Sequence, residues 1–253
     1  MKIWSLILLL LPTLASAMPE FSMDWEVVQD GTFLAADCKG LDGHAIEEKN
    51  KDTPSFDYCA CTSVIRVPQM RGLKDEAIQT GINQALREAV VGVGCDESQA
   101  YKLAAGRTGS RNLSYFDVKL ANTKLVSFLI WNDSYAAGAA HNSWNLQGMT
   151  FDLLTGKKLV PGDIIEADKF MPINRQIREE LSNASFAEFA KEQLSRKEGD
   201  FLTPEGCNGC AFNLTREGME VVFQLYEVAP YVNGNPKVII YRDDLKPSIA
   251  ELL

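Results

Sequence analysis

The N-terminal segment constrains the fold most strongly, because it sets the redox environment in which the cysteines react. Lys2 precedes an apolar run over residues 3–11, and residues 15–17 (Ala-Ser-Ala) form a small-residue cleavage site. This order is typical of a secretory signal peptide. The run is shorter than the roughly 20 apolar residues that span a bilayer. We therefore expect residues 1–17 to be removed and the mature chain to be periplasmic or secreted.

An even number of cysteines outside the cytoplasm indicates disulfide bonds. The six cysteines that follow the expected cleavage site are Cys38, Cys59, Cys61, Cys95, Cys207 and Cys210. Sequence alone allows about 15 pairings. Because four of the six lie in the N-terminal third, we expect two bridges among those four and one local bridge between Cys207 and Cys210.

The Cys207–Cys210 pair also has the spacing of a redox-active dithiol, which is reactive where it opens a helix. Here a Pro-Glu-Gly turn precedes it and a strand-like segment follows, and Asn208-Gly209 between the two cysteines favours a tight turn. A structural disulfide is the favoured interpretation, and a thiol oxidoreductase is the alternative. We predict no metal site, because zinc would need two further ligands, and no cofactor.

Charge and composition limit the partners. The net charge of −9 argues against nucleic acid and anionic lipid, both of which are bound through Lys and Arg contacts to phosphate. With 46% hydrophobic residues the chain can bury a core. After the signal segment, no stretch is long and apolar enough to predict a membrane span.

Hydrophobic periodicity predicts an α+β fold, an antiparallel β-sheet with helices packed on one face and stabilised by disulfides. Strands are expected over 24–28, 58–67, 113–120, 125–131, 144–153, 201–203, 211–214, 219–226 and 237–241, and helices over 73–90, 170–181, 185–194 and from 245. Pro68 is expected to end a strand, and Gly148 to mark a bulge. An N-terminal strand and Cys-containing loop (18–57) should form one compact unit with residues 58–253.

Two sets of short segments carry a family resemblance. The first is Tyr135-Ala-Ala-Gly-Ala-Ala-His141-Asn142-Ser-Trp144, followed by the Phe-Asp-Leu-Leu-Thr-Gly block over 151–165. The second is Phe-Leu-Thr-Pro-Glu-Gly at 201–206, Tyr-Glu-Val-Ala-Pro-Tyr at 226–231, and Val-Ile-Ile-Tyr at 238–241. Together they resemble the bacterial extracytoplasmic domain shared by RsiV-type anti-sigma factors and the N-terminal region of PdaC-type peptidoglycan deacetylases.

The resemblance implies an envelope domain that binds lysozyme in RsiV-type proteins and accompanies a wall-modifying enzyme in PdaC-type proteins. This sequence shows neither a sigma-binding segment with a membrane helix nor a deacetylase domain. It also carries the Cys207–Cys210 segment between the two C-terminal motifs. We therefore expect a non-catalytic cell-envelope binding module with a lysozyme-like protein or a peptidoglycan fragment as partner.

The candidate ligand-binding residues lie in the family-like segments: Tyr135, His141, Asn142, Trp144, Tyr226, Glu227 and Tyr231. No catalytic residues are predicted, because the sequence has no H-E-x-x-H, P-loop, G-x-G-x-x-G or G-x-S-x-G motif. A wall glycan hydrolase that pairs Glu227 with Asp133 or Asp152 is a further alternative, which the distance between the carboxylates would decide. A third alternative is a structural protein that binds no small ligand.

Overall fold

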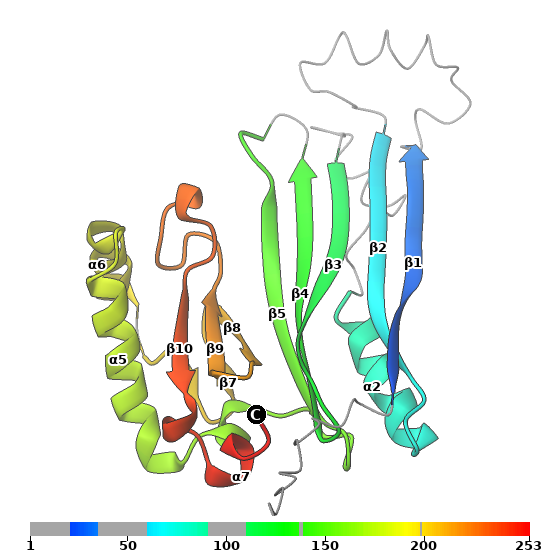
Figure 1. The fold of residues 1–253 in the computed structure, drawn as a ribbon. Coiled ribbons are helices and arrows are strands. Elements are labelled where there is room, and N and C mark those ends of the chain that lie inside the picture. The colour runs from blue at the N-terminus through cyan, green and yellow to red at the C-terminus, as the bar shows by residue number, and fades with distance from the viewer. Residues whose placement is uncertain (1–20, 35–59, 91–109, 137–138, 198) are drawn as a thin grey trace, which may run out of the picture.

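The computed structural model describes residues 21–34, 60–90, 110–136, 139–197 and 199–253. Figure 1 shows four layers in order: helices α5 and α6, a three-stranded sheet, a five-stranded sheet and helix α2. Among the described residues, no helix has the length and apolar character needed to cross a membrane. Cys38, Cys59 and Cys95 lie outside the described residues, so the predicted bridges among these three and Cys61 stay a prediction.

The described strands are β1 (Ser22–Leu34), β2 (Ala60–Arg71), β3 (Ser110–Ala121), β4 (Leu125–Ala136), β5 (Ser143–Asp152), β6 (Leu202–Thr203), β7 (Gly206–Cys207), β8 (Cys210–Leu214), β9 (Gly218–Phe223) and β10 (Lys237–Tyr241). The α-helices are α2 (Glu76–Glu88), α4 (Pro161–Ile164), α5 (Phe170–Ser182), α6 (Ala187–Arg196) and α7 (Pro247–Ala250). Short 3-10 helices are η2 (Ala167–Lys169), η3 (Tyr231–Asn233) and η4 (Arg242–Asp244).

The five-stranded sheet corrects the expected antiparallel arrangement. Its order is β1-β2-β3-β4-β5, and β2 and β3 run parallel while the other neighbours are antiparallel. The chain leaves β2, forms α2 and starts β3 at the end where β2 began, and such a crossover makes the two strands parallel. The fold is therefore α+β with a mixed sheet rather than a wholly antiparallel one.

Helix α2 covers one face of this sheet. Its inward residues Ile82 and Leu86 are buried against a cluster that includes Phe128 and Ile130 of β4. Asp75 caps the helix, because its carboxylate accepts hydrogen bonds from the backbone N–H groups of Ala77 and Ile78. The expectation of helices on one face therefore holds for α2.

The second sheet, β10-β9-β8, is wholly antiparallel and lies between α5 and the five-stranded sheet. All of β9 is buried. Val221 and Phe223 pack in the cluster that contains Ile173 and Ile177 of α5, while Val222 packs on the five-stranded sheet. The core is thus divided between two layers of contacts, and the helices do not all cover a single sheet. The short β6 and β7 form a separate pair.

Two local predictions fail for reasons visible in the sheet. Pro68 lies inside β2 opposite Trp25 instead of ending the strand. The β2–β3 pairing stops at Ile65, so β2 beyond that point has one neighbour, and proline is tolerated there. Gly148 is not a bulge, because β4–β5 register is continuous. A Cβ at Gly148 would overlap the carbonyl oxygen of Phe212, so glycine lets β8 approach β5.

Candidate functional site

Six aromatic rings form a continuous series of contacts from β3 to the loop that follows β9. We call them the aromatic row: Tyr115, Trp131, Trp144, Tyr231, His141 and Tyr226. Successive ring centroids from Tyr115 to His141 are 5.7, 6.5, 5.3 and 3.9 Å apart, and the last step to Tyr226 is 5.9 Å. The Tyr115–Trp131 and His141–Tyr231 pairs are stacked. Contacts at these distances are favourable for aromatic rings.

Strand pairing places the first three rings. Tyr115 of β3 lies directly opposite Trp131 of β4, and Trp144 of β5 lies opposite Asp133. Since side chains two residues apart on a strand share a face, Trp131 and Asp133 point the same way. That face is the one that packs on the three-stranded sheet, because Trp131 and Trp144 adjoin the cluster containing Val222.

Hydrogen bonds connect the 139–142 segment to the loop after β9. The Tyr231 hydroxyl donates to Asn142 Oδ1 at 2.6 Å, and Asn142 Nδ2 donates to Asp133 Oδ2 at 2.8 Å. The Trp144 Nε1–H donates to Asn235 Oδ1. Two segments about ninety residues apart in the chain are thereby held at one end of the five-stranded sheet.

Both ring nitrogens of His141 are engaged. Nδ1 lies 2.8 Å from the Asn142 carbonyl oxygen, and Nε2 lies 2.8 Å from the Tyr226 hydroxyl. A carbonyl oxygen only accepts hydrogen bonds, so Nδ1 carries the hydrogen. The Nδ1–H tautomer leaves Nε2 to accept from the Tyr226 hydroxyl. The imidazole thus anchors the loop while stacking on Tyr231.

Asp133 is an acidic residue whose side chain lies next to the aromatic row. It is 8% exposed, and its Oδ1 has no hydrogen-bond partner among the described residues. Burial raises the pKa of Tyr115, and the charges of Asp133 and Asp117 raise it further. The Asp133 carboxylate therefore lies within electrostatic range of the Tyr115 hydroxyl as well as bonding Asn142. The indole nitrogen Nε1 of Trp131 is buried and likewise unpaired in the described part of the chain.

Tyr226 has an uncommon backbone conformation. Its φ of 61° lies in the left-handed region, and among the described non-glycine residues no other has a positive φ. Such a conformation is unfavourable for a bulky side chain and persists where the surrounding structure holds it. Here the hydrogen bond to His141 holds the Tyr226 side chain, which is nevertheless 46% exposed. The loop therefore presents this ring to solvent at one end of the row.

The structure brings together five of the seven predicted ligand-binding residues: His141, Asn142, Trp144, Tyr226 and Tyr231. Tyr135 is close by in sequence, and its hydroxyl donates to the Ala139 carbonyl oxygen at 3.2 Å. Glu227 has a different environment, because it forms an ion pair with Lys197 and lies against Gly209. Asp152, the other carboxylate considered for a hydrolase, accepts from the backbone N–H groups of Leu154 and Thr155 in a turn.

The site also contains residues that the sequence did not single out as ligand-binding: Tyr115, Trp131, Asp133 and Asn235. The alternation of Trp131, Asp133 and Tyr135 on one strand was a readable signal, since all three share a face. The stacking of Tyr115 on Trp131 was not readable, because it depends on the β3–β4 register.

The predicted local disulfide between Cys207 and Cys210 is confirmed, with 5.3 Å between the two Cα atoms. Gly209 in the connecting turn has φ of 73°, which glycine adopts readily. The bridge joins β7 to the start of β8, so it does not open a helix. Both sulfur-bearing side chains are half-buried against the core beside α5.

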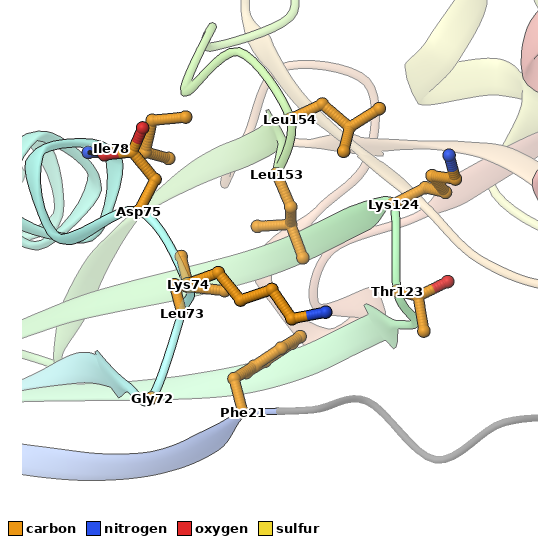
Figure 2. A pocket seen from close by; sticks show the side chains of 10 residues that line it. All are labelled: Phe21, Gly72, Leu73, Lys74, Asp75, Ile78, Thr123, Lys124, Leu153 and Leu154. Atoms are coloured by element: carbon orange, nitrogen blue, oxygen red, sulfur yellow. Dashed lines mark hydrogen bonds between the residues drawn. The ribbon is translucent and has the colours of Figure 1, made fainter.

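A separate cavity of about 350 Å³ lies at the other end of the five-stranded sheet. Figure 2 shows its lining from the residue before β1, the β2–α2 connection, the first turn of α2, the β3–β4 turn and the segment after β5. Phe21, Leu73 and Leu153 supply apolar surface, and Lys74 reaches into the space between Phe21 and Leu153. No predicted site residue lines this cavity.

Fold and site together define an α+β domain of two packed sheets with an aromatic row at their junction. Residues 162–243 match the family model described as protein of unknown function, DUF3298. The matched segment runs from α4 into η4 and includes the three-stranded sheet with its helices. It also contains Tyr226 and Tyr231 of the aromatic row.

Two crystal structures of DUF3298 family proteins have similar folds. One, from Bacteroides fragilis NCTC 9343, is 16% identical with a TM-score of 0.60, and the match covers 92% of this chain and 98% of that chain. The other, from Pseudomonas aeruginosa PAO1, is 14% identical with a TM-score of 0.56, covering 90% and 96% respectively. No curated protein matches this chain. These matches name neither RsiV-type nor PdaC-type proteins, so that relationship stays a prediction.

Proposed function

We propose that this protein is a non-catalytic, exported binding module of the bacterial cell envelope, and that its ligand docks at the aromatic row. The ligand is a cell-wall component or a protein such as a lysozyme. One observation carries the proposal: two distant chain segments converge to hold His141, Trp144 and Tyr231 in contact at one end of the sheet. Aromatic side chains with a hydrogen-bonding end are enriched where proteins bind ligands and partners.

The hydrogen bonds of the row favour binding over chemistry at His141. For His141 to act as a base, a substrate proton has to reach Nε2, and in this structure Nε2 is hydrogen-bonded to the Tyr226 hydroxyl while Nδ1 is hydrogen-bonded to the Asn142 carbonyl oxygen. These bonds fix the orientation of three polar rings before any ligand arrives. A preorganised surface of this kind loses little side-chain entropy on binding.

The glycosidase alternative receives no comparable support. Such an enzyme needs two carboxyl groups that flank the same bond. Glu227 is engaged by Lys197, and Asp152 is engaged in a turn. Asp133, in contrast, bonds the side chain of Asn142, which itself bonds Tyr231. This arrangement supports a role for Asp133 in shaping a binding surface.

Co-sedimentation with insoluble peptidoglycan and capture on lysozyme beads test the proposal. The full chain is expected to bind one of the two matrices, and the double variant His141→Ala/Tyr231→Ala is expected to lose at least about tenfold in affinity. Tyr241→Ala is the matched control, because Tyr241 is an exposed tyrosine on β10 outside the row. Equal binding by wild type and the double variant, or no binding to either matrix, contradicts the proposal.

A further inference from the structure

We infer that the ligand is a saccharide chain, and that its binding surface continues from the aromatic row across β3 and β2 to Trp25. This inference rests on the proposed function and extends it by naming the ligand class and a second part of the surface. Trp25, Tyr115 and Tyr226 are 56%, 45% and 46% exposed. Trp25 and the two ends of the aromatic row are therefore open to solvent, while the rings between those ends are half-buried.

The binding surface can continue to Trp25 because the three-stranded sheet covers only part of the five-stranded sheet. Its β8 lies over β5 and β4, where Gly148 and Ser127 contact Phe212 and Leu214. On the same face of β1, β2 and β3, exposed residues include Trp25, Val27, Arg66 and Tyr115. An exposed apolar area of this kind on a sheet marks an interaction site.

A cavity of about 370 Å³ lies in this open area. Trp25, Tyr115 and Arg66 line it together with Val64 and Leu113. Its position follows from topology: β2 and β3 pair only from Cys61 to Ile65 and from Ser110 to Ser114, so the strands separate at Tyr115. The opening lies beside Tyr115, and it thus adjoins the first ring of the row.

The polar groups along the surface select hydroxyl-rich ligands. Asp133 Oδ1 is a buried acceptor and Trp131 Nε1 a buried donor, and both lack partners within the described residues. Buried groups of this kind are costly when unpaired. A sugar hydroxyl both donates and accepts, so hydroxyls that reach these groups satisfy either one after a small movement of the rings.

Ring geometry fits the same ligand class. Pyranose rings have apolar C–H faces that pack on aromatic rings, while their hydroxyls point outward to polar groups. Ring centroids are spaced at 5.3–6.5 Å over the first three steps of the row, from Tyr115 to Tyr231. A longer chain can therefore use more rings at once, which makes chain length the diagnostic variable.

Isothermal titration calorimetry with N-acetylglucosamine oligomers of two, four and six units tests the inference on the full chain. We expect affinity to rise at least about tenfold from the shortest to the longest oligomer. The double variant Trp25→Ala/Tyr115→Ala should abolish most of this gain. Tyr241→Ala should behave as wild type, and circular dichroism melting curves establish that each variant is folded.

The outcomes separate this inference from the proposed function. Affinity that does not depend on oligomer length, or a length dependence that survives the Trp25/Tyr115 substitutions, overturns the extended surface but leaves a ligand site at His141 and Tyr231. Binding to lysozyme beads without binding to any oligomer or to peptidoglycan overturns the saccharide assignment alone. Binding to none of these probes overturns both the saccharide inference and the proposed function.

Discussion

The three-stranded sheet and the five-stranded sheet differ in how much of each face other elements cover. Every residue of β9 is buried, with α5 on one side and the five-stranded sheet on the other. The five-stranded sheet is covered by α2 on one face, but on the other β8 contacts β5, β4 and, less extensively, β3. The open part carries Trp25 and Tyr115. The three-stranded sheet therefore contributes mainly to the stability of the core, and the five-stranded sheet exposes the surface that we assign to ligand binding.

The largest expected effect is a difference in unfolding free energy between two variants, each with one side chain truncated in one of the two sheets. Phe223 is fully buried and packs edge-to-face on Phe201, so Phe223→Ala should lower the free energy of unfolding by about 3–5 kcal/mol. Tyr115 is 45% exposed, so Tyr115→Ala should cost less than about 1 kcal/mol. Urea denaturation of both variants provides the comparison. Equal losses would mean that the open face is part of the stabilising core.

The junction of the two sheets is the next point to test. A Cβ at Gly148 would overlap the Phe212 backbone, so Gly148→Ala should force β8 away from β5 and cost about 3 kcal/mol. Gly81 in α2 has open space around it, so Gly81→Ala should stabilise the protein by roughly 0.5–1 kcal/mol. Thermal unfolding of the two variants measures both effects, and a neutral Gly148→Ala would contradict the close approach.

Glu220 lies between the two sheets and should make a pH-dependent contribution of intermediate size to the free energy of unfolding. Burial alone would raise the pKa of Glu220, but hydrogen bonds from Lys237 and Asn213, with the charges of Lys237 and Lys119, hold it below its usual 4.5. Because this pKa is lowered, the ionised carboxylate stabilises the native state at pH values above its usual pKa. This stability is lost as the pH falls through the lowered pKa.

The matching variant is Glu220→Gln. It should lower the free energy of unfolding by about 1–3 kcal/mol at neutral pH, because it removes charged hydrogen bonds from a side-chain position that is 4% exposed. The difference from wild type should shrink as the pH falls below 4.5. Denaturation curves at neutral and acidic pH measure it. A difference that is constant with pH would contradict the assigned ion pairs.

The smallest expected effect concerns the open face. Burial, Asp133 and Asp117 together raise the pKa of Tyr115, so its neutral form should persist to a higher pH than that of an ordinary tyrosine. Asp133→Asn should lower this pKa towards its usual value without restoring it, since burial remains the largest cause. Ultraviolet titration of tyrosinate formation, with Tyr115→Phe to assign the transition, measures the shift. An unchanged pKa would place the carboxylate out of range of Tyr115.

Local sequence patterns predicted most elements, because periodicity reports directly which face is buried. They also found His141, Trp144 and Tyr231, which lie in short motifs on loops and strand ends. The mixed sheet was not predictable, since hydrophobic patterns do not reveal whether a strand returns parallel. The bulge predicted at Gly148 was wrong for a related reason. Glycine is needed there because the backbone of Phe212 packs against it, and Phe212 lies more than sixty residues later in the chain.

The part of the site on β3 and β4 was missed for the same physical reason. Tyr115 stacks on Trp131 only because the β3–β4 register sets the two residues opposite each other. Trp25 adjoins Tyr115 only because β2 lies between β1 and β3 and separates from β3 after Ile65. Each relationship depends on a pairing that no local window of sequence contains.

Intrinsic tryptophan fluorescence tests the central claim most directly, because Trp25, Trp131 and Trp144 all lie on the proposed binding surface. The fourth tryptophan, Trp4, belongs to the expected signal segment and is removed as a reporter by Trp4→Phe in the full chain. Titration with soluble peptidoglycan fragments should change the emission saturably, and His141→Ala/Tyr231→Ala should abolish the change. Fragments that bind by calorimetry while the emission stays constant would contradict the assignment of this surface.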